Sequence, residues 1–178
     1  MKQTNIEIKA KCFNPDNIRS ILKSRKARYV GKDHQIDTYF KVNRGRLKLR
    51  EGNIENNLIY YDREDKRGPK ESNVLLFKTE LDSSIKQILS TALGVFVVVE
   101  KEREIYFIDN IKFHIDSVRS LGSFIEIEAM AFNGMENKEE LFKQCNFYLN
   151  LFNIPEKDLI LKSYSDLLMR KNKCSDGI

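Results

Sequence analysis

The chain has 178 residues, with 31 Lys and Arg against 26 Asp and Glu, and a formal net charge of +5. This length suits one domain, which can bury a core without a disulfide or a structural metal. Eight Gly and three Pro exclude collagen-like and Pro/Gly-rich disordered classes. No apolar run approaches the length of a membrane span, and the N-terminal residues lack the apolar stretch of a signal peptide. We therefore expect a cytoplasmic protein without a membrane partner.

The cysteine and histidine content excludes two further classes. Cys12, Cys145 and Cys174 are an odd number and contain no CxxC pair, so the disulfide framework of a secreted protein is not expected. The two histidines, His34 and His114, do not have the spacing of a zinc site. The net charge is modest and no nucleic-acid motif accompanies it, so we expect no nucleic-acid partner.

In chain order, the first half of the sequence begins with a strand and a helix. Ile6, Ile8 and Ala10 alternate with polar residues, which predicts a strand over 5–11. Asn14 and Pro15 suit the N-cap and the first turn of a helix that ends before Gly31. Further alternation predicts strands over 37–42, 45–50, 58–63 and 74–79, and a Gly-Pro pair indicates a loop over 64–73.

The second half continues with a helix that starts at 82–84 and ends before Gly94. Three strands are then predicted over 96–107, 112–118 and 124–130. Apolar residues at helical spacing predict two last helices, over 136–152 and 157–170. We expect one domain over 1–170 and a flexible tail over 171–178.

The predicted strands alternate between charged and apolar residues. Residues i and i+2 of a strand point to the same side of the sheet, so Ile6 and Ile8 oppose Glu7 and Lys9. For a single strand this alternation usually means a solvated outer face. Here both signs of charge recur on most strands, and the helices need an apolar sheet face to cover. One α+β fold explains both the charged faces and the helices. It is a closed, mainly antiparallel eight-stranded β-barrel, with the charged side chains in its lumen and the helices packed outside.

Such a lumen contains mostly Lys and Arg, together with a smaller group of carboxylates. Buried charges are costly unless they are paired or bind a ligand. Lys and Arg suit phosphate oxygens, whereas Asp and Glu suit Mg²⁺ or Mn²⁺, which also binds phosphates. We therefore expect a ligand that combines a polyphosphate with a divalent cation.

Seven stretches occur in an order that a known family shares: NIEIKAK at 5–11, HQIDTYF at 34–40, GRLKLRE at 45–51, LIYYDRED at 58–65, EKEREIYF at 100–107, FHIDSVRSLGSFIEIE at 113–128 and KSYSDLL at 162–168. With them the sequence resembles the CYTH superfamily of triphosphate tunnel metalloenzymes. Within that superfamily it is most similar to the class IV adenylyl cyclase-like branch. The resemblance extends over nearly the whole chain and implies the same tunnel fold.

The resemblance also implies roles for individual residues. The family's opening signature ExExK is replaced here by Asn5-x-Glu7-x-Lys9, which lacks the first acid. Glu7 and Lys9 are the implied catalytic residues. The implied ligands of Mg²⁺ or Mn²⁺ are Glu7, Asp116, Glu126 and Glu128. The implied triphosphate-binding residues are Lys9, Lys11, Arg46, Lys48, Arg50, Arg63, Lys78, Lys101 and Arg103.

The same resemblance implies a divalent-metal-dependent enzyme that processes a small-molecule triphosphate. Members of the family convert ATP to cyclic AMP and pyrophosphate, or hydrolyse inorganic or thiamine triphosphate. The branch favours the cyclase activity, and hydrolysis is the alternative. Because Asn5 brings no charge to the metal site, a non-catalytic nucleotide or polyphosphate binder is a second alternative. We expect a monomer or a homodimer.

Overall fold

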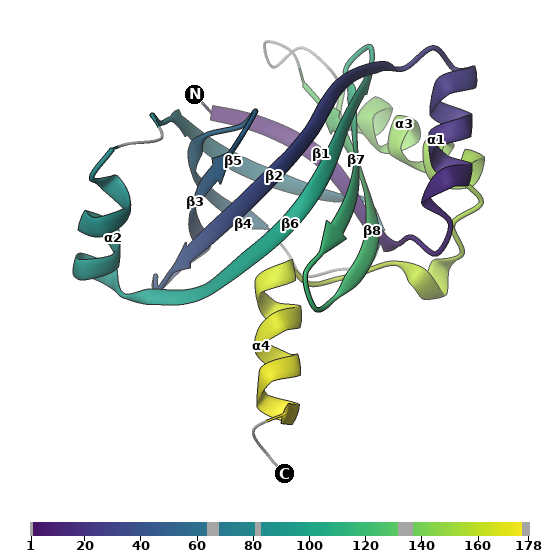
Figure 1. Cartoon of the computed structure of the whole chain (residues 1–178). Coiled ribbons are helices and arrows are strands. Elements are labelled where there is room, and N and C mark those ends of the chain that lie inside the picture. The colour runs from purple at the N-terminus through teal and green to yellow at the C-terminus, as the bar shows by residue number, and fades with distance from the viewer. Residues whose placement is uncertain (1, 64–67, 81–82, 132–136, 176–178) are drawn as a thin grey trace.

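The structure is a computed structural model that describes residues 2–63, 68–80, 83–131 and 137–175 (Figure 1). The strands are β1 Lys2–Lys11, β2 Arg28–Phe40, β3 Arg46–Gly52, β4 Asn57–Arg63, β5 Lys70–Lys78, β6 Val95–Ile108, β7 Ile111–Val118 and β8 Gly122–Met130. The helices are α1 Pro15–Ser24, α2 Ile85–Leu93, α3 Lys138–Leu151 and α4 Tyr164–Ser175, with a short 3₁₀ turn at Glu156–Asp158. No helix in these ranges is long and apolar enough to cross a membrane.

The eight strands form one closed barrel in the order β1-β5-β4-β3-β2-β6-β7-β8. Each neighbouring pair is antiparallel. The predicted α+β class and the closed eight-stranded barrel are therefore confirmed. Since each strand of a closed sheet has one face toward the lumen, alternation along the sequence becomes alternation between inside and outside.

Several strands begin earlier than the sequence pattern indicates, and the longest such extensions are in β2 and β5. β2 starts at Arg28 rather than at 37, and β5 starts at Lys70 rather than at 74. Residues 70–73 were expected in a loop, but Lys70 and Ser72 pair with Glu7 and Asn5 of β1. Residues 70–73 are all polar, so no alternation of apolar residues marks them as a strand. Their hydrogen bonds to β1 hold them in the extended conformation. The rest of the expected loop, 64–67, lies outside the described residues.

The last helix also differs from its prediction. A helix was expected over 157–170, but α4 begins only at Tyr164. The Ile160 amide donates a hydrogen bond to the Lys9 carbonyl at 2.8 Å. The segment just before α4 is therefore hydrogen-bonded to β1 and is not helical. Ser163 and Asp166 then form reciprocal backbone caps at the start of α4. Residues 171–175, expected in a tail, are helical, and 176–178 lie outside the described residues.

The main apolar core lies outside the barrel wall, as the alternation predicts. α1 and α3 lie on the same side of the barrel (Figure 1), and they cover the outward faces of β1, β7 and β8. Ile8, Phe113 and Ile127 are at most 1% exposed there, and Leu22 of α1 and Leu141 of α3 complete the contact. Burial of this much apolar area is the principal stabilising contribution to the fold.

A second apolar cluster shows that the lumen is not charged along its whole length. It lies where α4 meets the barrel and consists of Tyr39, Ile59, Tyr61, Val99, Val118, Phe124, Tyr164 and Leu168. Phe124 and Tyr164 pack edge to face with ring centroids 4.9 Å apart. α4 and this cluster therefore fill one end of the lumen, and the charged residues lie beyond them.

Candidate functional site

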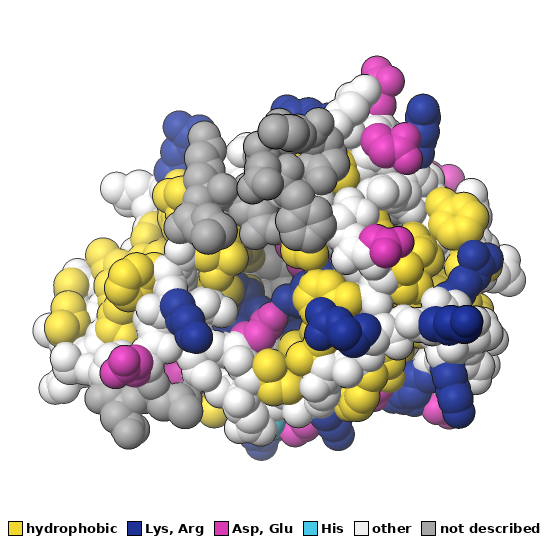
Figure 2. Space-filling view, turned by 90° about the horizontal axis from the view of Figure 1, so that it is seen from above, with side chains coloured by type: hydrophobic (Ala, Val, Ile, Leu, Met, Phe, Trp, Pro, Cys, Tyr) yellow, Lys and Arg dark blue, Asp and Glu magenta, His cyan; other side chains and the backbone are white. Residues whose placement is uncertain are grey.

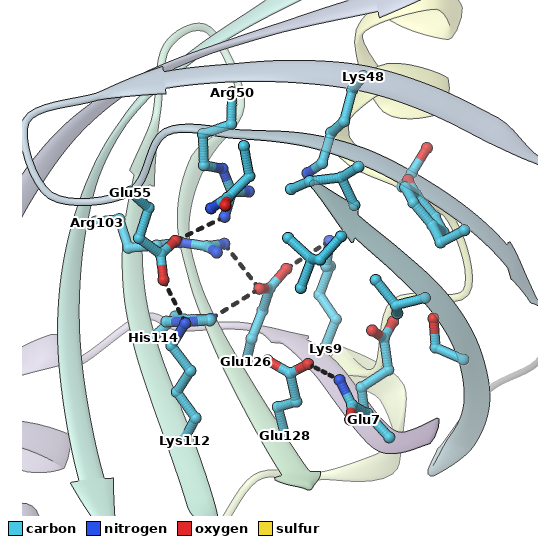
Figure 3. Close-up of a pocket in the computed structure, with 18 of the residues that line it drawn as sticks. Glu7, Lys9, Lys48, Arg50, Glu55, Arg103, Lys112, His114, Glu126 and Glu128 are labelled. Carbon is cyan, nitrogen blue, oxygen red and sulfur yellow. Dashed lines mark hydrogen bonds and ion pairs between the residues drawn. The ribbon is translucent and has the colours of Figure 1, made fainter. Parts of the chain in front are cut away.

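A pocket in the barrel lumen gathers most of the charged residues that the sequence places inside. Acidic and basic side chains lie close together in the opening at the centre of Figure 2. Figure 3 shows that they come from several strands and point toward one another. The charged lining residues are Glu7 and Lys9 of β1, Lys48 and Arg50 of β3, Glu55 of the next loop, Lys101 and Arg103 of β6, Lys112 of β7, and Glu126 and Glu128 of β8.

Three of the lining cations share one carboxylate behind the pocket wall. Asp37 of β2 is 1% exposed and accepts hydrogen bonds from Lys48 Nζ at 2.8 Å, Lys101 Nζ at 2.7 Å and Arg50 Nε at 2.8 Å. Burial alone would raise the pKa of Asp37, but Arg50, Lys101 and Lys48 hold it well below its usual range. The ionised carboxylate therefore fixes three positive groups at the pocket surface.

Asp116, one of the predicted metal ligands, plays a similar part on the other side. It is fully buried, and its oxygens accept hydrogen bonds from Arg103 Nε at 2.7 Å, Arg103 Nη2 at 2.5 Å and the Tyr164 hydroxyl at 2.7 Å. It is not among the residues that line the pocket. The structure thus places Asp116 behind Arg103, where it orients the guanidinium. Arg103 Nη2 also donates to Glu126, so this guanidinium lies between the two carboxylates.

Glu126 lies at the centre of the pocket and contacts cations on both sides. Its carboxylate is 2.7 Å from Lys9 Nζ and 2.7 Å from Arg103 Nη2. Burial would raise the pKa of Glu126, but Lys9 and Arg103 hold it well below its usual range. Burial, with help from Arg103 and Lys112, lowers the pKa of His114 to about 3. A neutral His114 therefore donates from Nδ1 to Glu126 at 3.2 Å.

Two further acidic residues, Glu7 and Glu128, lie on the side of the pocket where β1 and β8 pair. Glu7 and Glu128 are register partners, and the Asn5 amide Nδ2 donates to Glu128 Oε1. Asn5 Oδ1 is buried and has no hydrogen-bond partner among the described residues. Carboxylate and amide oxygens suit a hard divalent cation. These donors therefore fit Mg²⁺ or Mn²⁺ in chemistry, although no three acidic, His or Cys side chains of the described chain already converge as a metal site.

The wall formed by β4 and β5 differs from the rest of the pocket. Its lining residues are Asn57, Ile59, Tyr61, Ser72, Val74 and Leu76. No residue of this set carries a charge. As far as its described lining residues show, the pocket therefore has a charged side, made by β1, β3, β6, β7 and β8, and a largely apolar side made by β4 and β5.

Three residues predicted to bind the triphosphate are not among the described residues that line this pocket, and a fourth has a side chain that is not described. Lys11 and Lys78 are exposed at the ends of β1 and β5. Arg46 binds Asp166 of α4 at 2.8 Å and lines a separate hollow beside α4. The side chain of Arg63 lies outside the described residues. Lys11 and Lys78 alternate in phase with the lumen-facing residues of their strands. Each is the last residue of its strand, however, and so lies beyond the pocket.

Several residues of the site were missed in the sequence. Asp33, Gln35 and Asp37 lie on one face of β2, and their spacing of two was a signal that could have identified them. Lys112 shares its strand face with His114 and was also detectable. Glu55 comes from the loop between β3 and β4, where no periodicity exists. Only the folded chain shows that its carboxylate enters the pocket.

Comparison with known proteins agrees with this geometry. The family model of the CYTH domain matches residues 3–164. A Methanocaldococcus jannaschii protein, provisionally named an adenylate cyclase, is 27% identical, and the match covers 91% of this chain and 97% of that protein. A Pyrococcus horikoshii protein of solved structure, also 27% identical, superposes with a TM-score of 0.79 over 92% of this chain and 98% of its own.

A more distant structure extends the likeness of fold. It is a plant protein from Hippeastrum, described as an adenylyl cyclase candidate with a dominant triphosphatase activity. It superposes with a TM-score of 0.61 at 11% identity, and the match covers 96% of each chain. The family to which the matching model belongs generally uses divalent metals. With a family match over nearly its whole length and an eight-stranded barrel around a charged lumen, the chain belongs to the CYTH domain family.

Proposed function

We propose that the pocket binds a triphosphate together with Mg²⁺ or Mn²⁺ and converts it, with ATP cyclisation to cyclic AMP and pyrophosphate as the leading reaction. One observation carries the proposal: among the described residues, six cations line a single pocket that also contains three strand carboxylates. The cations are Lys9, Lys48, Arg50, Lys101, Arg103 and Lys112, and the carboxylates are Glu7, Glu126 and Glu128.

The charge balance supports a ligand of this kind. The lining carboxylates Glu7, Glu55, Glu126 and Glu128, with Asp37 and Asp116 behind the wall, equal the six cations in number. A triphosphate alone would add several negative charges to a site that is already close to neutral. A divalent cation bound with it offsets part of that charge. The site therefore favours a metal–triphosphate complex over a bare polyanion.

The protein side chains would hold and polarise the triphosphate. Lys48, Lys101 and Arg103 are fixed by buried carboxylates, so their donors are positioned before the ligand arrives. Such donors stabilise the charge that grows on the leaving phosphate oxygens. A divalent cation held by Glu7, Glu128 and the Asn5 side-chain oxygen would supply positive charge there and lower the pKa of an attacking hydroxyl or water.

The apolar wall favours an organic triphosphate over inorganic triphosphate. Ile59, Val74 and Leu76 offer no donors to phosphate oxygens, but they can contact a nucleoside or another organic group. The provisional name of the Methanocaldococcus relative also points to ATP. Hydrolysis to a diphosphate is the second candidate, because the Hippeastrum protein of the same fold is described as mainly a triphosphatase. Both reactions use the same groups and differ in the attacking nucleophile.

A product assay tests the proposal. Purified protein is incubated with ATP, thiamine triphosphate and inorganic triphosphate, each with Mg²⁺ or Mn²⁺, and the products are separated by chromatography. Cyclic AMP with pyrophosphate supports the cyclase, and a diphosphate with inorganic phosphate supports the triphosphatase. Tight binding without turnover would identify a non-catalytic binder. Neither binding nor turnover of any of the three would refute the proposal.

Replacing Asn5 by Glu is expected to strengthen the binding of Mn²⁺ or Mg²⁺. The metal concentration that gives half of the maximal activity or thermal stabilisation should fall by about tenfold, which corresponds to about 1.4 kcal/mol. The new carboxylate would face Glu128, so the variant should be less stable without metal and gain more from it. Melting temperature as a function of metal concentration measures this independently of activity. Asn57→Glu is the control, because it adds the same charge to the pocket on the apolar wall, away from Glu7 and Glu128. An unchanged metal dependence in Asn5→Glu would contradict the expectation.

A further inference from the structure

Glu55 differs from the other acidic residues of the pocket because it does not come from a strand. It lies in the loop between β3 and β4 and lines the pocket. Arg50 Nη1 donates to its Oε2 at 2.8 Å, Gln35 Nε2 donates to the same oxygen at 3.1 Å, and Lys112 Nζ contacts its Oε1. Figure 3 shows the carboxylate reaching the cations from the side of the pocket. One anion therefore already occupies a subsite made by two cations and an amide.

The loop that carries Glu55 is held in place by a buried carboxylate. Asp33 is fully buried and accepts hydrogen bonds from the backbone amides of Ile54 at 2.8 Å and Glu55 at 3.0 Å. Gly52 allows this approach, because a Cβ at that position would lie 2.7 Å from Asp33 Oδ1. The position of Glu55 is thus built into the fold and does not result from a free loop that happens to fall onto the pocket.

The other carboxylates that pair with these cations have different places. Asp37 and Asp116 lie behind the wall and do not line the pocket, so a ligand can bind in front of them. Glu126 projects from β8 at the centre and contacts Lys9 and Arg103. Glu55 alone among the described lining carboxylates reaches its cations, Arg50 and Lys112, from a loop. Its two oxygens stand where phosphoryl oxygens would otherwise bind these two groups.

We propose that Glu55 is a specificity-determining residue that occupies the Arg50–Lys112 anion subsite in place of a phosphoryl group and so limits the length of the polyphosphate chain that the tunnel accepts. This inference rests on the proposed triphosphate-binding function. A fourth phosphoryl group would have to displace the carboxylate or lie against it, and the repulsion between two anions disfavours both. Without the charge of Glu55, the same cations become available to a longer chain.

Binding of inorganic di-, tri- and tetraphosphate to natural protein, Glu55→Gln and Glu55→Ala, measured by calorimetry, tests the inference. Glutamine keeps a hydrogen-bonding group near Arg50, and alanine removes the side chain. We expect both variants to bind tetraphosphate at least tenfold more tightly than the natural protein does, with a much smaller gain for diphosphate. The matched control is Glu51→Gln, which removes a carboxylate that pairs with Lys86 on the outside of the barrel.

The outcomes separate this inference from the proposed function. A gain that increases from di- to tetraphosphate in both Glu55 variants, and is absent in the control, supports the inference. An equal gain for all three chain lengths would overturn it, because it would reveal a general charge effect. No gain, or weaker binding, would also overturn it while natural protein still binds triphosphate. Failure of the natural protein to bind these polyphosphates, and also ATP and thiamine triphosphate measured beside them, refutes the proposed function itself. Circular dichroism and melting curves establish that each variant is folded.

Discussion

Replacing Asp37 by Asn is expected to lower the free energy of unfolding by about 3–5 kcal/mol, the usual cost of removing one partner of a buried ion pair. The substitution preserves shape but leaves Lys48, Arg50 and Lys101 around a neutral amide. For a chain of this length, such a loss lowers the melting temperature by roughly 6–20 °C. Thermal unfolding followed by circular dichroism measures it. Asp62→Asn is the control, because Asp62 pairs with Arg44 at the exposed surface.

The pH dependence of stability gives a second measurement of the same effect. The pKa of Asp37 is lowered in the folded state, so its contribution is complete above the unfolded-state pKa of about 4 and is lost as the pH falls through the folded value. The natural protein should therefore lose stability steeply below about pH 4. Asp37→Asn should show a flatter dependence over that range. Equal stability and an equal acid transition in the two proteins would contradict the role assigned to Asp37.

The barrel could be predicted because its strands alternate almost without interruption. Where that alternation failed, so did the prediction. The first part of β2 has polar residues on both faces, with Lys32 and His34 outside and Asp33 and Gln35 inside, so no apolar period marks it. Pairing with β6 along its length extends this strand. The extended conformation of this segment therefore depends on pairing with β6, which the local sequence pattern does not reveal.

The β4–β5 wall was missed for the opposite reason. β5 has apolar residues on both faces, with Val74 and Leu76 inside and Leu75 and Phe77 outside. A continuous apolar run does not show which of its residues face the lumen. The expectation of a charged lumen therefore holds for the strands with clear alternation, but the described lining residues of β4 and β5 carry no charge.

The alternation of residues along a strand also predicts whether a side chain points into the barrel, but it does not predict how far along the barrel axis that side chain lies. Lys9 and Lys11 share a face of β1, yet Lys9 is buried in the pocket and Lys11 is exposed beyond it. Depth depends on the stagger between neighbouring strands, which is a property of the closed sheet as a whole. The loop residue Glu55 lay beyond the reach of any strand pattern. These two limits account for most of the difference between the predicted and the observed site.

Replacing Lys9 by Met is expected to weaken the binding of inorganic triphosphate by about 30-fold to several thousand-fold, which corresponds to about 2–5 kcal/mol for the loss of one buried charged partner. Lys9 Nζ lies 2.7 Å from Glu126 and 3.5 Å from the centroid of the Tyr164 ring. These contacts hold the ammonium group within the pocket. Methionine keeps the apolar stem but leaves Glu126 with less positive charge, so the site repels an incoming polyanion more strongly.

Lys11→Met is the matched comparison for Lys9→Met, because it makes the same change on the same face of β1 but outside the pocket. We expect its triphosphate affinity to stay within about threefold of the natural value, since an exposed charge outside the pocket acts through solvent. Calorimetry measures both affinities, and melting curves show whether each variant is folded. Unaltered binding in a folded Lys9→Met protein would place the triphosphate outside this pocket. An equal loss in Lys11→Met would mean that strand parity, rather than depth, decides which lysines bind the ligand.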